Sequence, residues 1–208
     1  MISVPAGFPA VLEIDYPDRG LDRLTSFVRP FTVIPIAILL GLVTKSTVRS
    51  GSANYVVGSG GIVFLATVVM LLFRQKYPRW WFDWNLALTR FGARVWAYLA
   101  LLRDEYPSTD DEQAVHIEIA YPAATRDLNR WLPLIKWFLA IPHYVVLSFL
   151  CVAACVCVII AWFAILFTGR YPRSLFDFVV GTFRWWLRVA AYAFLLTTDR
   201  YPPFSLSA

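Results

Sequence analysis

Residues 171–202, YPRSLFDFVVGTFRWWLRVAAYAFLLTTDRYP, have an imperfect copy in residues 77–107, YPRWWFDWNLALTRFGARVWAYLALLRDEYP. Both stretches begin with Tyr-Pro-Arg, carry Phe-Asp three residues later and end in Tyr-Pro. Arg184 and Arg188 of the later stretch match Arg90 and Arg94 of the earlier one. The matching positions predict that the chain is a tandem duplication.

Each of these stretches has the pattern of a helix with one charged edge. At about 100° per residue, Asp177, Arg184 and Arg188 fall within roughly 40° of one another, because steps of 7 and 11 residues nearly complete whole turns. A wide apolar face with a narrow cationic edge is typical of a helix that lies in the plane of a membrane interface. The alternative is a further membrane-crossing helix whose arginines are paired inside the protein.

The residues that we expect to contact lipid or partner subunits lie in and beside these two stretches. They are Arg79, Asp83, Arg90, Arg94, Arg170, Arg173, Asp177, Arg184, Arg188, Trp185 and Trp186. The later arginines are expected to form a cationic rim for anionic headgroups, with the aromatic residues among the acyl chains. Asp177 and Arg184 are interpreted as a polar stripe and not as a catalytic pair, since they lie two turns apart.

The composition is typical of a membrane protein. Of 208 residues, 59% are hydrophobic, 17% are aromatic and only 16% are charged. The net charge of +5 does not indicate a nucleic-acid partner, because the basic residues flank apolar runs instead of gathering on a polar face. We expect anionic membrane lipids as partners, together with other membrane-protein subunits.

Four membrane-crossing segments in two hairpins are predicted. In the first repeat they are residues 30–44 and 50–73, joined by a polar turn at 45–54. In the second repeat the uncharged run 137–169 is either a tight hairpin or an interfacial helix ending near Pro142 followed by one tilted span. Basic residues at both flanks of each run, Arg29 and Lys136 among them, favour hairpins with both termini in the cytoplasm.

The predicted fold class is therefore an all-α integral membrane protein with two repeats, each a transmembrane hairpin plus an in-plane helix. The first repeat covers residues 11–107, an acidic linker covers 108–115, and the second repeat covers 116–204. Each repeat starts with alternating apolar and polar residues that end at a Tyr-Pro pair, at 11–17 and 116–122. These short extended segments could pair with each other, and the Tyr-Pro pairs are interpreted as corners at the membrane interface.

Residues suited to catalysis or metal binding are scarce. His116 and His143 are the only histidines and are far apart in the chain. The three cysteines, at 151, 155 and 157, lie inside an apolar run at spacings unlike those of a zinc site. Ser174 is better explained as a helix cap than as a nucleophile, because no histidine stands near it. We expect no enzyme activity, no cofactor and no metal.

A family resemblance rests on the second repeat. The motifs that carry it are Phe167 to Pro172, Leu175 to Phe178, Gly181, Arg184-Trp185, Arg188-Val189, Ala191-Tyr192 and Leu195 to Phe204, with Ala140 to Tyr144 before them. They resemble the uncharacterised bacterial membrane family called domain of unknown function 4389. The resemblance implies a protein of the bacterial inner membrane with no established activity. The first repeat departs from the family, with Trp80-Trp81 in place of Ser174-Leu175 and extra residues after Thr44.

These observations lead to one expected function and one alternative. We expect a non-catalytic accessory or scaffold subunit of a membrane protein complex in the bacterial inner membrane, with a lipid-contacting surface. The alternative is a lipid-handling or small-solute transport protein that uses the interface between the repeats.

Overall fold

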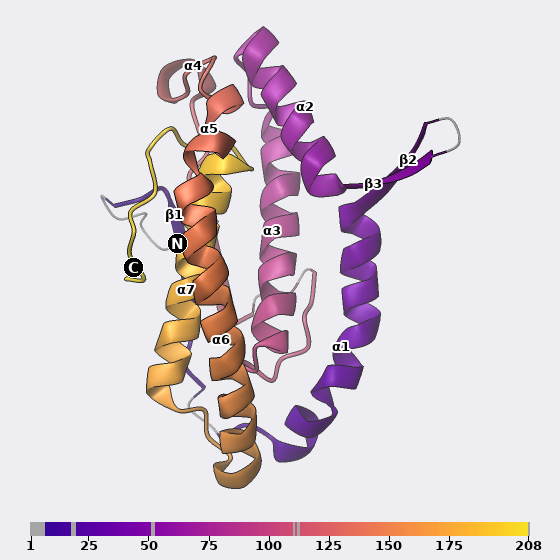
Figure 1. Cartoon of the computed structure of the whole chain (residues 1–208), viewed down its shortest axis with the longest axis vertical. Coiled ribbons are helices and arrows are strands. Elements are labelled where there is room, and N and C mark those ends of the chain that lie inside the picture. The colour runs from indigo at the N-terminus through magenta and orange to yellow at the C-terminus, as the bar shows by residue number, and fades with distance from the viewer. Residues whose placement is uncertain (1–6, 18–19, 51–52, 110, 112, 208) are drawn as a thin grey trace.

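The computed structural model describes residues 7–17, 20–50, 53–109, 111 and 113–207. It is mostly helical. The elements of its first half are β1 (Ala10–Ile14), α1 (Arg23–Thr44), β2 (Lys45–Ser50), β3 (Ala53–Gly58), α2 (Ser59–Arg74) and α3 (Arg79–Leu99). Those of its second half are β4 (Val115–Ile119), α4 (Ala124–Asp127), α5 (Pro133–Leu139), α6 (Ile141–Thr168) and α7 (Arg173–Ala193). Figure 1 shows the long helices running along the long axis of an elongated molecule.

Strands β1 and β4 form an antiparallel pair, which confirms the predicted pairing of the two extended segments. Leu12 lies opposite Ile117 and Ile14 opposite Val115. The period of two places these apolar side chains on one face, where they are buried in the core, and leaves Glu13 and His116 exposed on the other. The sheet therefore has one face on the helices and one polar face outside.

The helices cover the apolar face of the sheet in an exchanged arrangement. α7 of the second half packs on β1 of the first, and α3 of the first half packs on β4 of the second. α6 then packs against α7, and α1 packs against α3 and α6. In Figure 1, α6 lies in front of α7 and the label of β1 lies beside them. The main core contains the inward strand residues together with Phe176, Val179 and Leu187 of α7.

α6 is a single continuous helix, so the hairpin predicted within residues 137–169 is wrong. Pro142 stands in its first turn, where a missing backbone N–H costs nothing, and Gly169 ends it with a φ of 73°. No turn residue interrupts the run between them. The structure instead has the arrangement given as the alternative, in which a short helix, α5, is followed by one long helix, α6. Among the residues that the structure describes, α6 is the one helix long and apolar enough to cross a membrane.

The first half also differs from the predicted hairpin. The expected turn at 45–54 is replaced by a β-hairpin, β2 with β3, in which Lys45 lies opposite Gly58 and Ser50 opposite Ala53. α2 begins only at Ser59 and has 16 residues, or about 24 Å, which is shorter than the roughly 30 Å hydrocarbon core. The β-branched residues in these strands favour extended backbone over a simple turn. The described residues of the first half therefore do not show the predicted pair of crossing helices.

The predicted amphipathic helices are present as α3 and α7, but the face they bury is different from the one expected. Most of α7 is buried inside the protein, including Val179, Leu187 and Arg188. Its apolar face meets α6 and its charged edge meets β1 and the C-terminal segment. α7 is thus a core helix, and its amphipathic pattern reflects two different protein neighbours instead of lipid on one side and water on the other.

Candidate functional site

Two of the predicted contact residues, Arg184 and Arg90, bind backbone carbonyls of the two strands. Arg184 of α7 donates from Nε to the Leu12 oxygen at 3.0 Å, and Arg90 of α3 donates from Nε to the Ile117 oxygen at 3.0 Å. Leu12 and Ile117 lie opposite each other in the sheet. In a two-stranded sheet, alternate carbonyls of each strand point away from the other strand and have no partner in the sheet. The carbonyls of Leu12 and Ile117 are of this kind. Each of the two arginines therefore satisfies one outward-facing carbonyl of the sheet.

One turn further along α7 and α3, Arg188 and Arg94 bind the chain segments that follow these two helices. Arg188 donates from one guanidinium nitrogen to the carbonyls of Ser205 and Ser207, at 2.6 and 2.9 Å. Arg94 donates to the carbonyl of Ser108 at 2.7 Å. Arg188 is only 6% exposed, and burial, followed by the nearby Arg184, lowers its pKa below the usual value. The guanidinium groups of Arg184 and Arg188 therefore bind backbone carbonyls of the chain itself, and their contact with lipid headgroups stays a prediction.

The remaining predicted site residues are divided between aromatic contacts and the surface. Arg79 stacks on Tyr121 at 5.2 Å and Arg173 on Tyr16 at 4.5 Å, measured to the ring centroids. Arg173 also lies 3.4 Å from the exposed carboxylate of Asp177. The exposed members of the predicted set are Arg79, Asp83, Arg90, Arg170, Arg173, Asp177 and Trp186, whereas Trp185 is buried. The structure therefore does not gather the predicted residues into one surface.

Two buried ion pairs connect the start of each half to the segment after its last long helix. Lys136 of α5 lies 2.6 Å from the Asp199 carboxylate and donates to the Thr198 carbonyl at 2.8 Å. Arg29 of α1 pairs with Asp104 in the same manner. Burial lowers the pKa of the Lys136 ammonium, and Asp199 partly offsets this.

Each buried cation of these pairs also faces a tyrosine. The Arg29 guanidinium lies 4.6 Å from the Tyr98 ring centroid, and the Lys136 ammonium lies 5.2 Å from that of Tyr192. Arg29 and Lys136, predicted as flanks of membrane spans, are instead interior groups, with exposed fractions of 1% and 0%. Their carboxylate partners lie too far along the chain for local spacing to reveal them.

Tyrosines of the Tyr-Pro pairs cross between the halves. Tyr16 donates its hydroxyl to the Tyr171 carbonyl at 2.5 Å, and Tyr121 donates to the Tyr77 carbonyl at 2.6 Å. Tyr77 and Tyr171 are both buried. Burial raises the pKa values of both phenols well above the usual range. Tyr77 and Tyr171 are therefore interior residues, whereas Tyr121 is 42% exposed, and the position of the Tyr-Pro pairs at a membrane interface stays a prediction.

His143 is fully buried and lies at the centre of an aromatic cluster, in which Tyr201 and Phe204 are 45% and 53% exposed. The indole of Trp185 donates to its Nδ1 at 3.1 Å, so the imidazole carries its proton on Nε2. Phe204 stacks on the ring at 4.0 Å between centroids, and Tyr201 lies at 4.8 Å. The cluster fastens the C-terminal segment to α6 and α7. Its members are far apart in the chain, so only the family motif around residues 140–144 pointed to it.

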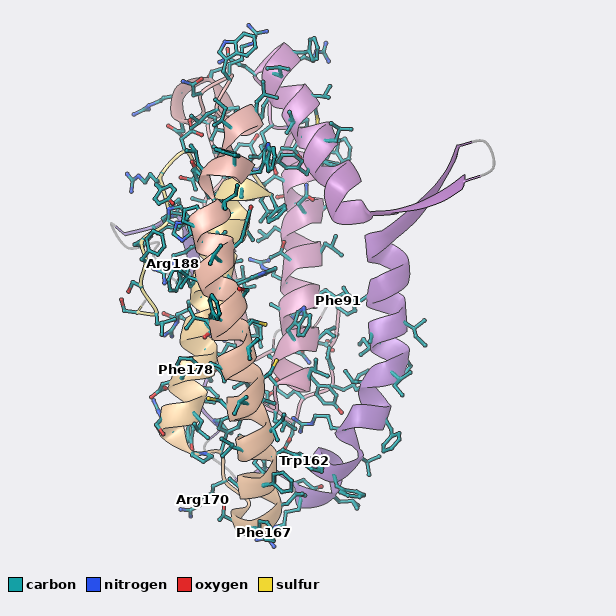
Figure 2. All side chains as sticks on the ribbon, viewed as in Figure 1. Phe91, Trp162, Phe167, Arg170, Phe178 and Arg188 are labelled. Atoms are coloured by element: carbon teal, nitrogen blue, oxygen red, sulfur yellow. The ribbon has the colours of Figure 1, made fainter. Side chains whose placement is uncertain are left out.

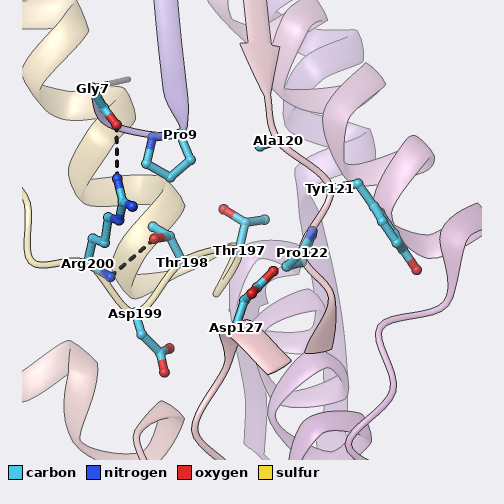
Figure 3. Close-up of a pocket in the computed structure, with 10 residues that line it drawn as sticks. All are labelled: Gly7, Pro9, Ala120, Tyr121, Pro122, Asp127, Thr197, Thr198, Asp199 and Arg200. Atoms are coloured by element: carbon cyan, nitrogen blue, oxygen red, sulfur yellow. Dashed lines mark hydrogen bonds between the residues drawn. The ribbon is translucent and has the colours of Figure 1, made fainter. Parts of the chain in front are cut away.

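A pocket of about 730 Å³ lies where the segment before β1, the segment after β4 and the segment after α7 meet (Figure 3). It is lined by Gly7, Pro9, Ala120, Tyr121, Pro122, Asp127, Thr197, Thr198, Asp199 and Arg200. Its charged groups already have partners in the protein. Arg200 donates to the Gly7 carbonyl at 3.2 Å, Asp199 pairs with Lys136, and Asp127 accepts from the backbone of Ala123 at 3.1 Å. The pocket is therefore formed where three chain segments meet, and each of its charged side chains already interacts with another group of the protein.

Groups suited to metal binding do not meet in the parts of the chain that the structure describes. No three side chains of His, Cys, Asp or Glu come together there as a possible metal site. The cysteines are free thiols; Cys151 and Cys155 are exposed on α6 and Cys157 is half-buried.

The largest feature without a partner is the outer side of α6. Only 11% of its most apolar 18-residue window is buried inside the chain. Its large exposed side chains are Ile141, Val145, Val146, Phe149, Val152, Val156, Ile159, Ile160, Phe163 and Phe167. α1 contacts α6 through the Trp162 indole, which donates to the Ser26 carbonyl at 3.1 Å, and adds exposed Phe27 and Phe31 nearby. Figure 2 shows Trp162, Phe167 and Arg170 towards the C-terminal end of α6. We call the exposed residues of α6 the α6 apolar face.

Comparison with known families places one part of the chain. Residues 131–205 match the family described as Domain of unknown function (DUF4389). The match confirms the resemblance expected from the second half and covers α5, α6 and α7. No curated protein and no solved structure matches the chain.

Proposed function

We propose that this chain is a non-catalytic accessory or scaffold subunit of a membrane protein complex in the bacterial inner membrane. The observation that carries the proposal is the α6 apolar face. Phe149, Val152 and Phe167 are 72%, 66% and 78% exposed. An apolar patch of this extent is stable only against acyl chains or another apolar protein surface.

The polar groups support a structural role for the interior. Arg184 and Arg90 bind strand carbonyls, and Lys136 and Asp199 bind each other. Groups that are held in this way stabilise one arrangement of the chain. A rigid body with an exposed apolar surface fits a subunit that presents a fixed face to its surroundings.

We also propose that the two halves arose by tandem duplication, with the repeats at residues 11–107 and 116–204. Support comes from contacts that recur in both halves. Arg29 with Asp104 corresponds to Lys136 with Asp199, and Tyr16 on Tyr171 corresponds to Tyr121 on Tyr77. The positive φ angles of Leu101 and Leu196, 62° and 56°, recur at the ends of α3 and α7.

The experiment that tests the function is photo-crosslinking from the α6 apolar face in intact cells. A photoreactive amino acid at Phe149 or Val156 should yield adducts with lipid and with a distinct protein. The same probe at His116, on the polar face of the sheet, is the control and should give neither the lipid adduct nor the protein adduct. Recovery of the chain as a monomer in the aqueous fraction without detergent would overturn the proposal.

A further inference from the structure

The two strands lie beside the middle of the long helices. Arg184, which binds the Leu12 carbonyl, is near the midpoint of α7, and Arg90, which binds the Ile117 carbonyl, is near the midpoint of α3. The segments that flank β1 reach the two ends of α7, which packs along α6: Tyr16 donates to the Tyr171 carbonyl just before α7, and Gly7 accepts from Arg200 after it. The sheet is therefore at the level of the interior of α6 and not beyond either of its ends.

The outer face of this sheet is charged. Glu13 and His116 are exposed and lie opposite each other, and Asp15 lies 3.7 Å from the His116 Nε2. Glu118 shares this face and is half-buried. If α6 crossed a bilayer upright, these groups would be at the depth of the hydrocarbon core. Ionisable side chains at that depth are costly and rare unless they face a protein interior or a water-filled cavity.

Both ends of α6 are surrounded by exposed basic residues. Near its C-terminal end, Arg23 lies beside Gly169, and Arg170 and Arg173 follow the helix. Around its N-terminal end, Arg130 binds the carbonyls of Leu72 and Phe73 at the end of α2. The other exposed basic residues of that end are Arg74, Lys76, Arg79 and Arg126.

This charge distribution distinguishes two orientations. A helix that crosses the inner membrane has its basic residues concentrated on one side. A helix that lies along the surface presents both of its ends to the anionic headgroups of the same leaflet. Basic residues at both ends of α6 fit the second case.

We propose that the chain lies in one leaflet of the membrane, with α6 parallel to the membrane surface and the outer face of the β1–β4 sheet in water. The α6 apolar face enters the acyl region by about 5–10 Å, as amphipathic elements at interfaces do. The basic residues at both ends contact anionic lipid headgroups. This inference rests on the proposed membrane function and specifies its orientation and lipid class.

The test measures the depth of several positions in the full chain. With the three native cysteines changed to Ala, single cysteines at Val145, Val152, Ile159 and Phe167 sample the exposed side of α6 along its length. Glu13→Cys and His116→Cys sample the sheet. Each is spin-labelled, and its accessibility to oxygen and to a water-soluble nickel complex is measured in phospholipid vesicles containing about one quarter phosphatidylglycerol.

We expect the four α6 labels to have similar depths and the two sheet labels to be as accessible to nickel as labels in water. A depth that is greatest at Val152 and Ile159 and falls at both ends, with shielded sheet labels, would overturn the in-plane orientation while leaving membrane association intact. Full nickel accessibility at all six positions would overturn both this inference and the proposed function. Vesicles without the anionic lipid should bind the chain several-fold more weakly, and unchanged binding would overturn the role of the basic ends.

Discussion

At the scale of single residues, the free-energy cost of burying the cations Lys136 and Arg29 is offset by carboxylates beside them. Lys136 is fully buried, and the Asp199 carboxylate beside it is 23% exposed. A buried cation of this kind is destabilising when its partner is removed, because the remaining charge has neither water nor a counter-ion. The contribution of such a pair to stability is therefore measured by substituting one of its two residues at a time.

We predict that Asp199→Asn lowers the free energy of unfolding by roughly 3–5 kcal/mol, because the Lys136 ammonium loses its counter-ion. Thermal unfolding of the purified chain in detergent measures this. Asp177→Asn is the matched control: Asp177 pairs with Arg173 at the surface, where such pairs contribute roughly 0–1 kcal/mol. Equal effects of the two substitutions would contradict the buried pair. The double change Lys136→Met with Asp199→Leu should recover most of the loss.

Two glycines provide a second comparison at this scale. A Cβ at Gly181 would lie 3.0 Å from both Cβ and the carbonyl oxygen of Leu206, whereas a Cβ at Gly92 would meet nothing within 4 Å. We predict that Gly181→Ala displaces the C-terminal segment and destabilises the fold. Gly92→Ala should stabilise α3 by about 0.5–1 kcal/mol, since alanine is the better helix former. Unfolding temperature and the rate of proteolysis after Phe204 report the two effects, and identical behaviour of both variants would refute the contact.

At the scale of elements, the sheet is the junction between the two halves. The backbone bonds from Asp15 to Ala114, at 3.2 Å, and from Ala120 to Pro9, at 2.9 Å, extend the ladder beyond both ends of the pair. This register places odd-numbered residues of β1 in hydrogen-bonded pairs and leaves the Leu12 carbonyl for Arg184. The arginines and the register therefore depend on each other.

We predict that the double variant Glu13→Cys with His116→Cys forms a disulfide on mild oxidation, in a background without the native cysteines. These residues are direct partners in the antiparallel pair, where side chains lie about 4.5–5.5 Å apart. The crosslink is detected as a mobility shift that reductant reverses. Glu13→Cys with Glu118→Cys, a diagonal pair, is the control and should crosslink much more slowly. Preferential crosslinking of the diagonal pair would indicate a different register.

At the scale of the whole molecule, neither half encloses its own core. β1 is covered by α7 and β4 by α3, so each half supplies the strand that the other half's helix packs against. The part that matches the family, residues 131–205, contains α7 but neither strand. Isolated halves would expose strand edges and buried apolar side chains such as Leu12 and Val179 to solvent.

We predict that fragments 1–109 and 113–208, expressed together as separate chains, associate and co-purify through a tag on one of them. The reason is that the exchanged contacts of the sheet and helices do not require the linker to be intact. Fragment 113–208 expressed alone should be degraded or aggregate. A stable, monodisperse fragment 113–208 would contradict the exchanged arrangement, and co-purification should be lost when Arg184 and Arg90 are both changed to Glu.

Sequence patterns alone predicted two of the helices, the pairing of two strands and the family match. The repeated stretches predicted α3 and α7, because apolar residues at helical spacing form a buried stripe whatever covers them. The alternation at 11–17 and 116–122 predicted two strands that pair, and the motifs of 140–204 predicted the family match. The composition and its apolar runs predicted four membrane-crossing segments, and the described residues contain one helix long and apolar enough to span, α6.

Only the tertiary structure decided what each polar face contacts. A guanidinium on a helix edge can bind either a phosphate or a backbone carbonyl, and the spacing of Arg184 and Arg188 is the same in both cases. The structure places carbonyls of Leu12 and Ser205 there, and these come from the other end of the chain and from the segment after α7. The sequence also left one helix or two open for 137–169, because an apolar run has no internal marker for a turn. Long-range packing decides both questions, since it alone determines whether an apolar or charged face meets protein or membrane.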